Sequence, residues 1–409
     1  MIDISSFIKK YVTKRPESMF GPDVVSNKSA LSECITSRSV LVIGGAGSIG
    51  SSFIRAILPF SPSELVVADT NENALTELTR SLRSSAVLAP FVPDVYLPYP
   101  MDYSSDTFRR MFSHHTRSTG KRGFDIVANF SAHKHVRSEK DIYSVEALLK
   151  NNVIHAKGLL ELLAGYPPEV YFCVSTDKAA NPVNIMGASK RIMEDLIFSY
   201  SDVFPVKTAR FANVAFSNGS LPAGFIERIN QRQPLSAPSD VRRYFVSPDE
   251  SGQICMLSAM LGKDREIFFP KLSEAEMTTF DKIAEDLLHN MGYEIIHCSS
   301  ETEAIERMAK RNEKDPYPVY FSPADTSGEK AFEEFYVEGE RVDLDRFSSL
   351  GVIIDKPVPD RRKVAGLIEA LDKLFESDTC DKDDVVNMIS QYLPNFKHIE
   401  TGKNLDEKM

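Results

Sequence analysis

The chain of 409 residues is 42% hydrophobic and 26% charged, the composition of a globular protein large enough for one two-lobed unit or two domains. Its formal net charge of −10 argues against a nucleic-acid partner, because binding to nucleic acid needs clustered excess lysine and arginine. The five cysteines lack C-x-x-C spacing and the apolar runs are far shorter than the roughly 20 residues of a membrane span, so we expect a cytoplasmic protein with neither a metal site nor a membrane helix.

Residues 1–38 are polar with a modest apolar stripe, and we predict a helical extension there. From residue 39 onward, short apolar segments alternate with helical patterns. The predicted strands are 39–45, 64–70, 95–99, 126–130 and 170–175, with helices at 51–58 and 72–84 among them. Buried strands that alternate with helices indicate a parallel sheet covered on both faces. Residues 39–205 are therefore predicted to form a doubly wound α/β domain of the Rossmann type.

The pattern becomes less regular after residue 205, where prolines and glycines separate shorter elements. We interpret residues 206–355 as a smaller substrate-binding lobe, partly interleaved with the Rossmann domain. Amphipathic helical patterns return in residues 356–409, which we predict to be a C-terminal helical extension. The two terminal extensions favour self-association, so we expect a homo-oligomer.

The segment GGAGSIG at 44–50 follows the first predicted strand and opens a helix. Its glycine spacing permits a tight turn and a close approach of the backbone to a pyrophosphate, which the N–H groups at the helix N-terminus then bind. The predicted cofactor-binding residues of this segment are Gly44, Gly47, Ser48, Ile49 and Gly50.

Two aspartates follow the next two strands. Asp69 closes the second strand, nineteen residues after Gly50, where a carboxylate accepts hydrogen bonds from the adenosine ribose. Because this carboxylate repels a 2′-phosphate and the neighbouring residues 70–72 include no arginine, NAD is predicted rather than NADP. Asp102 follows the third strand and is predicted to meet the adenine, with a simple turn or cap residue as the alternative.

A third motif, STDKAANPVNIMGASKR at 175–191, carries the candidate catalytic residues. Lys190 lies four residues after Met186, so the two side chains share one face of a helix. Thr176 ends a strand, at the sheet edge where open α/β sheets bind their ligands. This arrangement resembles the Ser/Thr, Tyr-x-x-x-Lys set of the extended short-chain dehydrogenase/reductases, with Met186 in place of the tyrosine. More specifically, it resembles the UDP-N-acetylglucosamine 4,6-dehydratases of bacterial polysaccharide biosynthesis, some of which carry methionine there.

The resemblance covers about residues 39–340. It extends through GGAGSIGS, HKHV at 133–136, Asn152, RFANVAFSNGS at 210–220, RRYF at 242–245 and GEKAFEEF at 328–335. It departs at NFSAH, where an alanine-rich strand end is expected, and at ADTSGEK, where an arginine often precedes GEK. Both departures bear on sugar and nucleotide specificity more than on the class of reaction.

The resemblance implies that C4 of a sugar is oxidised, water is eliminated across C5 and C6, and hydride returns to C6, with NAD regenerated in each turnover. Asp177 then acts as the acid for the C6 hydroxyl and Lys178 as the base for C5. These roles require that burial raise the pKa of Asp177 from about 3.9, and that Lys190 and the nicotinamide lower the pKa of Lys178 from about 10.4.

The proton on O4, which a tyrosine normally takes, needs another acceptor here. We expect a relay through Thr176 or water to Asp177 or to Lys190, which also binds the cofactor. The alternative for Met186 is core packing without a chemical role. By the same resemblance, Asn213 and Arg243 hold the diphosphate of the substrate. Arginine suits this role because its planar fork donates two hydrogen bonds at once.

Lys134 is predicted to face the same pocket, and an exposed loop lysine is its alternative. The leading hypothesis is a 4,6-dehydratase that acts on a nucleoside-diphospho-N-acetylhexosamine, of the retaining type by likeness to methionine-containing members. The same reaction on a GDP-sugar, a 4-epimerase or 4-ketoreductase, and a non-catalytic NAD- or sugar-nucleotide-binding regulator are the alternatives. The Asp177–Lys178 pair favours the dehydratase, because only an elimination needs it.

Overall fold

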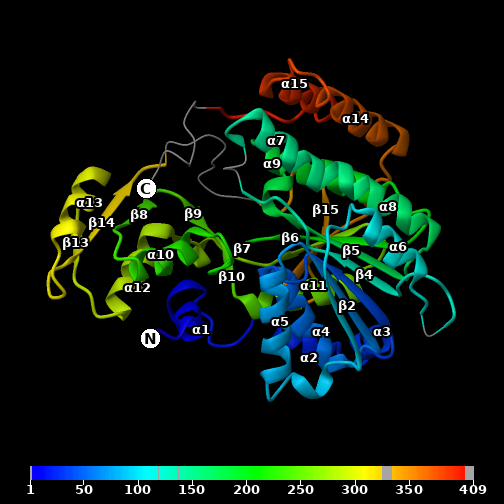
Figure 1. Cartoon of the computed structure of the whole chain (residues 1–409), viewed down its shortest axis with the longest axis horizontal. Helices are drawn as coiled ribbons and strands as arrows, with labels where there is room; N and C mark the ends of the chain where they lie inside the picture. Colours follow the sequence, from blue (N-terminus) through cyan, green and yellow to red (C-terminus); the bar gives the residue numbers. More distant parts are fainter. Residues whose placement is uncertain (1, 118, 136–138, 325–333, 401–409) are drawn as a thin grey trace.

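The computed structural model describes residues 2–117, 119–135, 139–324 and 334–400. Within these residues a nine-stranded sheet forms the centre of the molecule, in the order β15-β16-β11-β6-β5-β4-β1-β2-β3 (Figure 1). From β3 to β11 neighbouring strands pair in parallel, and β16 and β15 add an antiparallel edge. In chain order the strands are β1 (Ser39–Ile43), β2 (Glu64–Asp69), β3 (Val95–Pro100), β4 (Ile126–Asn129), β5 (Val170–Thr176), β6 (Val206–Phe211), β11 (Glu266–Pro270), β15 (Arg341–Asp343) and β16 (Leu350–Ile354).

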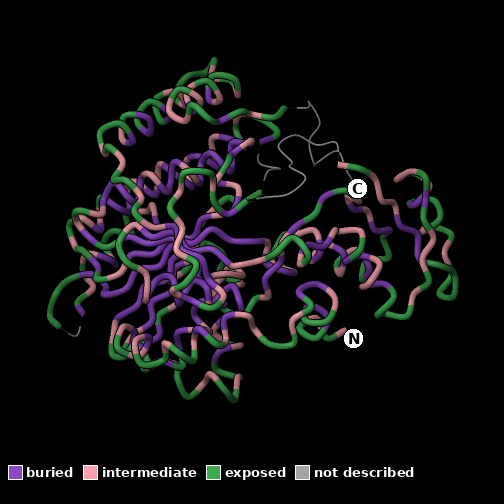
Figure 2. The backbone as a smooth tube through the Cα atoms, turned by 180° about the vertical axis from the view of Figure 1, so that it is seen from behind, coloured by how far each residue is buried: buried purple, intermediate pink, exposed green. Residues whose placement is uncertain are grey.

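Helices cover both faces of this sheet (Figure 1). One face carries α4 (Ser48–Ile57), α5 (Glu72–Ser84) and α11 (Pro248–Leu261), and the other carries α7 (Ile142–Leu149), α8 (His155–Gly165) and α9 (Ile185–Phe198), while α6 (Asp106–His114) lies beside α8. Strands β1, β4 and β6 are buried along their whole length, and Figure 2 shows the buried residues gathered along the strands. The predicted doubly wound α/β fold is confirmed. Its strand order reverses between β1 and β4, where such sheets bind ligands at the carboxyl edge.

A smaller lobe lies beside the sheet, at the left of Figure 1. It has its own apolar core, which includes Phe225, Leu235 and Leu287. Its elements are α10 (Leu221–Asn230), β8 (Leu235–Pro238), α12 (Phe280–Asn290), β13 (Ile295–His297), α13 (Glu301–Lys310) and β14 (Tyr317–Ser322). Residues 206–355 contribute to both bodies, because β6, β11, β15 and β16 lie in the large sheet. The division of the chain into two domains at residue 205 stays a prediction.

Both ends of the chain are helical where described. The N-terminal helices are α1 (Ile4–Phe7), α2 (Gly21–Ser26) and α3 (Lys28–Ile35). Phe7 packs in the core of the smaller lobe, whereas Phe20 and Leu31 pack in the core of the large sheet. At the other end, α14 (Arg361–Leu374) packs on the outer side of α9, and α15 (Lys382–Tyr392) lies beside α14 (Figure 1). Among all described residues, we find no helix with the length and apolar character needed to cross a bilayer.

Candidate active site

The glycine loop between β1 and α4 has the shape of a phosphate cradle. Gly44 has a φ of +68°, and a Cβ atom there would lie 2.7 Å from the backbone nitrogen of Ser131. A Cβ atom at Gly50 would lie 2.4 Å from the carbonyl oxygen of Gly44, so neither position accepts a side chain without a backbone shift. Gly47 is the N-cap of α4, and Ser48 and Ile49 begin the helix. The loop therefore leaves the first N–H groups of α4 at the carboxyl edge of the sheet, a fit for a pyrophosphate.

Asp69 lies against this loop at the end of β2. Its Oδ2 accepts a hydrogen bond from the backbone N–H of Ala46 (3.0 Å), and its Oδ1 accepts one from Asn71 (2.9 Å). The carboxylate is therefore fixed beside the cradle, where a ribose hydroxyl of a dinucleotide would reach it.

Asp102 is exposed and is the first residue of a turn before α6. Its Oδ1 accepts hydrogen bonds from the backbone N–H and the hydroxyl of Ser104, both at 2.8 Å. These contacts are those of a turn residue, and a contact between Asp102 and adenine stays a prediction.

Thr176, Asp177 and Lys178 form a contiguous cluster at the carboxyl end of β5. The hydroxyl of Thr176 donates a hydrogen bond to Oδ1 of Asp177 (2.8 Å), and Nζ of Lys178 lies 3.2 Å from the same oxygen. The backbone N–H of Lys178 donates to it as well (2.9 Å). The side chain of Asp177 is 4% exposed and that of Lys178 is 17% exposed, so the cluster is largely shielded from water. This arrangement can pass a proton between a hydroxyl and a carboxylate, with an amine beside them.

Met186 and Lys190 both lie on the buried face of α9. Met186 belongs to the apolar core, which is consistent with a packing role. Nζ of Lys190 donates a hydrogen bond to the carbonyl oxygen of Val174 (3.3 Å), two residues before Thr176. Burial lowers the pKa of Lys190, and the neighbouring Cys173 and Glu194 oppose this shift. The lysine is therefore a desolvated amine beside the end of β5.

The loop that begins at His133 is attached to α9 through Asn152. The side chain of Asn152 bonds both backbone groups of His133 (2.8 and 2.9 Å) and the hydroxyl of Ser189 (3.0 Å). Nζ of Lys134 donates to the carbonyl oxygen of Asn218 (3.0 Å), whose backbone N–H donates to the hydroxyl of Ser48 in the cofactor loop (2.9 Å). Lys134 thus approaches the glycine loop through Asn218. Val136 and residues 325–333 of the quoted motifs lie outside the described residues.

Asn213 and Arg243 lie on two short strands that belong to different two-stranded sheets. Asn213 opens β7 (Asn213–Val214), which pairs in parallel with β10 (Phe245–Val246), and its N–H donates to the carbonyl oxygen of Tyr244 (3.1 Å). Arg243 in β9 (Arg242–Arg243) is buried, and its Nη1 donates to the carbonyl oxygen of Arg242 (3.0 Å). This pairing places the backbone of Asn213 beside Tyr244, the residue after Arg243. A contact of either side chain with phosphate stays a prediction.

Comparison with known proteins gives the family. A family model described as polysaccharide biosynthesis protein matches residues 40–352. The chain belongs to this family. Its relatives include the uncharacterized membrane protein MJ1061 of Methanocaldococcus jannaschii, 29% identical over 77% of this chain and 85% of that protein. The probable polysaccharide biosynthesis protein EpsC of Bacillus subtilis is 29% identical over 81% of this chain and 53% of EpsC, so the chain spans about half the length of that relative.

A relative of named activity supports the resemblance found in the sequence. A UDP-N-acetylglucosamine 4,6-dehydratase (inverting) of Campylobacter jejuni is 26% identical over 63% of this chain and 73% of that enzyme. Among solved structures, Pen from Bacillus thuringiensis superposes with a TM-score of 0.61, at 18% identity over 83% of this chain and 98% of Pen. DesIV of Streptomyces venezuelae, a dTDP-glucose 4,6-dehydratase, superposes with a TM-score of 0.54, at 17% identity over 81% of this chain and 97% of DesIV. Identities this low show a shared fold alone.

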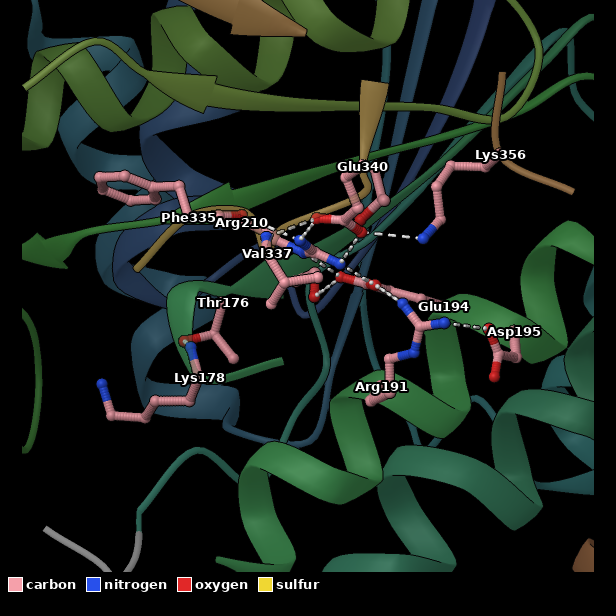
Figure 3. Close-up of polar contacts among 12 residues, drawn as sticks. Thr176, Lys178, Arg191, Glu194, Asp195, Arg210, Phe335, Val337, Glu340 and Lys356 are labelled. Atoms are coloured by element: carbon pink, nitrogen blue, oxygen red, sulfur yellow. Dashed lines mark hydrogen bonds and ion pairs between the residues drawn. The ribbon is translucent and has the colours of Figure 1, made fainter. Parts of the chain in front are cut away.

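In this polysaccharide biosynthesis protein, the sequence does not predict a buried charged network that lies behind the cluster of Thr176, Asp177 and Lys178. The hydroxyl of Ser175 donates to Oε1 of Glu194 (2.7 Å), and Arg210 binds both carboxylate oxygens of Glu194 (3.0 and 2.9 Å). Figure 3 shows Thr176 and Lys178 on one side of this network. The available signal was Glu194, a carboxylate four residues after Lys190 in a mostly apolar helix. Glu139, whose side chain accepts a hydrogen bond from Met186, carried no sequence signal.

Proposed function

We propose that this chain is an NAD-dependent nucleotide-sugar 4,6-dehydratase that converts an NDP-N-acetylhexosamine, specifically UDP-N-acetylglucosamine, to its 4-keto-6-deoxy product for surface polysaccharide synthesis. The observation that carries the proposal is the contact of Thr176, Asp177 and Lys178 at the carboxyl end of β5. An elimination needs an acid and a base that act at two adjacent carbons of one sugar. Asp177 and Lys178 are adjacent to each other, and their side chains are largely shielded from water. A 4-epimerase or a 4-ketoreductase needs no such pair.

The cofactor of the proposed reaction is NAD. Gly44, Gly47 and Gly50 leave room for its pyrophosphate, and the carboxylate of Asp69 beside them disfavours the 2′-phosphate of NADP. When bound, NAD accepts a hydride from C4 of the sugar and returns it to C6. DesIV, which shares the fold, has been solved with NAD bound.

The hydrogen bond between Thr176 and Asp177 suggests where the O4 proton goes when no tyrosine is present. Thr176 accepts the O4 proton as it passes its own proton to Asp177, because its hydroxyl already points at Oδ1 of that carboxylate (2.8 Å). Asp177 is then the protonated acid that elimination requires, and it gives the proton to the leaving C6 hydroxyl. The water that departs therefore carries the proton that began on the Thr176 hydroxyl, and the proton from O4 takes its place on Thr176.

Lys178 completes the elimination as the base at C5. In its uncharged form its amine takes the C5 proton while the C6 hydroxyl leaves, and it returns a proton to C5 when hydride arrives at C6. The buried amine of Lys190 instead donates to Val174, which fits a role in holding the cofactor and the end of β5 rather than in the elimination.

The proposal is tested by incubating the purified full chain in heavy water, without added reductant, with UDP-N-acetylglucosamine and separately with the GDP sugar. The expected product has lost one water, carries one deuteron at C5 and shows a new C6 methyl signal in the proton NMR spectrum. The nucleotide that reacts identifies the substrate class, and the ring coupling constants show retention or inversion at C5. A Lys178→Met variant serves as control and is expected to leave C5–H unexchanged. Unchanged sugar with both nucleotides, from protein that binds NAD, would contradict the proposal.

A 4-epimerase is the second candidate, because a UDP-glucose 4-epimerase of Rickettsia canadensis is 25% identical over 74% of this chain and 88% of that enzyme. The same experiment separates the two functions. An epimerase returns a sugar of unchanged mass with the opposite configuration at C4 and no deuteron at C5.

A further inference from the structure

Helix α9 carries both Met186 and Lys190. Its first turn is held by Glu139, a residue outside the motif at 175–191. The backbone N–H of Met186 donates to Oε1 of Glu139 (2.9 Å), while the next N–H, that of Gly187, donates to the side chain of the N-cap residue Asn184 (2.7 Å). These N–H groups have no partner within the helix, so their side-chain acceptors fix where the helix begins. Glu139 therefore sets the position of the helix that carries Lys190.

Glu139 and His133 are both attached to α9. Asn152 binds the backbone of His133 and reaches Ser189 on α9, and Glu139 reaches Met186 on the same helix. His133 and Glu139 are thus each attached to α9, the first through Asn152 and the second directly.

The C-terminal segment, which we define as Lys382–Glu400, holds Glu139 in turn. Nε2 of His398 lies 3.2 Å from the second carboxylate oxygen of Glu139, and Nζ of Lys382 donates to its main-chain oxygen (3.2 Å). The side chains of His398 and Glu139 are both shielded from water, with exposed fractions of 9% and 6%. The N–H of Ile399 donates to the carbonyl oxygen of Val183 (2.9 Å), just before α9. Lys382 also pairs with Glu400, which closes the segment on itself.

We propose that Glu139 is a positioning residue of the active site and that the C-terminal segment keeps it in place. The role of Glu139 in catalysis rests on the proposed function, whereas the contacts that hold it do not. Loss of its carboxylate leaves the N–H of Met186 without its acceptor at the start of α9. Lys190, one turn further along α9, then loses its fixed position relative to Thr176, and catalysis falls because it depends on that geometry.

The first test compares Glu139→Ala and Glu139→Gln in the full chain. Glutamine keeps an oxygen that can accept from Met186, so it is the rescue variant. We expect Glu139→Ala to lower kcat by roughly 10- to 100-fold with a much smaller change in KM, and Glu139→Gln to recover most of kcat. Equal kcat in the alanine variant and the wild type overturns the inference while leaving the dehydratase assignment intact. Equal loss in both variants overturns it too, because a carboxylate is then needed for another reason.

The second test does not depend on activity. Hydrogen exchange of residues 183–190 is measured for the wild type, for His398→Ala and for Lys397→Ala, whose parent side chain is exposed and serves as the matched control. We expect the Met186 amide to exchange roughly tenfold faster in His398→Ala and at the wild-type rate in Lys397→Ala. If the two variants exchange alike, the C-terminal segment does not hold Glu139. This outcome decides the inference even if no nucleotide sugar is found to react.

Discussion

Arg210 and Glu340 form a buried ion pair in which both carboxylate oxygens receive hydrogen bonds, at 3.0 and 3.2 Å. The guanidinium is wholly buried and also binds Glu194 in α9, so it joins α9 to the segment that leads into β15 (Figure 3). Nζ of Lys356 forms a further ion pair with the carboxylate of Glu340, at 2.8 Å. The charges balance within the network, which is what allows them to remain buried.

Removal of Arg210 is expected to destabilise the fold strongly. Arg210→Met leaves two buried carboxylates without their main partner, which should lower the free energy of unfolding by about 3–5 kcal/mol. The matched control is Arg341→Met, since Arg341 and Asp355 form an exposed ion pair that should contribute less than about 1 kcal/mol. Urea unfolding monitored by circular dichroism measures both. If both variants lost a similar free energy of unfolding, burial would not explain the contribution of the Arg210 network to stability.

The free energy of unfolding at acid pH should depend on the ionisation of Glu340. Burial alone would raise its pKa, but the charge and hydrogen bonds of Arg210 outweigh burial and lower the pKa to about 2 from the ordinary 4.5. A lowered folded-state pKa stabilises the fold above the unfolded value and loses this effect as the pH falls. Glu340→Gln should therefore be less stable than the wild type at pH 7, and the gap should narrow between pH 4.5 and 2. A gap that stays constant over this range would contradict the assignment.

The proton route predicts opposite results at Thr176 and Met186. Thr176→Val keeps the shape but removes the hydroxyl, so kcat should fall by roughly 100-fold or more, and Thr176→Ser should restore it. Met186→Leu conserves volume in the core and should change kcat by less than about threefold. Product formation by NMR measures all three rates. If Met186→Leu were as slow as Thr176→Val, the thioether would have a role beyond packing.

The buried amine of Lys190 should lower the free energy of unfolding. Its pKa is lowered by burial, so the unfolded chain binds more protons than the folded one, and wild-type stability falls as the pH drops below the ordinary 10.5. Lys190→Met should therefore raise the free energy of unfolding at pH 7, with a smaller gap between variant and wild type near pH 10. Lys157→Met is the control of opposite sign, because a hydrogen bond from Lys157 to Glu161 raises the pKa of that lysine. Denaturant titrations at both pH values decide the point.

The parts of the site that the sequence predicts are those built from neighbouring residues. Thr176, Asp177 and Lys178 are contiguous, and the glycine loop lies within seven residues, so their proximity follows from the local chain. Strands β1, β2 and β5 were recognisable because each is a short apolar run buried on both faces.

The parts that the sequence does not predict depend on long-range pairing. Glu139 meets His398 across a separation of 259 residues, and Arg210 meets Glu340 across 130. β6 and β11 are neighbours although α10 and β8 lie between them in the chain. No periodicity within one segment specifies its partner, so these contacts became visible only in the folded chain.

Asp69 should determine which dinucleotide the protein prefers. Its carboxylate lies beside the glycine loop, fixed by the N–H groups of Ala46 and Asn71, so Asp69→Asn removes the charge while keeping the size of the side chain. A hydrogen bond to a charged group contributes about 1.5–3 kcal/mol, so the preference for NAD over NADP should fall by roughly tenfold or more. Asp94→Asn, at an exposed carboxylate before β3, is the control and should leave the preference unchanged. Equilibrium binding of both dinucleotides to the purified chain measures the ratio. If the wild-type protein bound NADP as tightly as NAD, the placement of Asp69 in the cofactor site would be wrong.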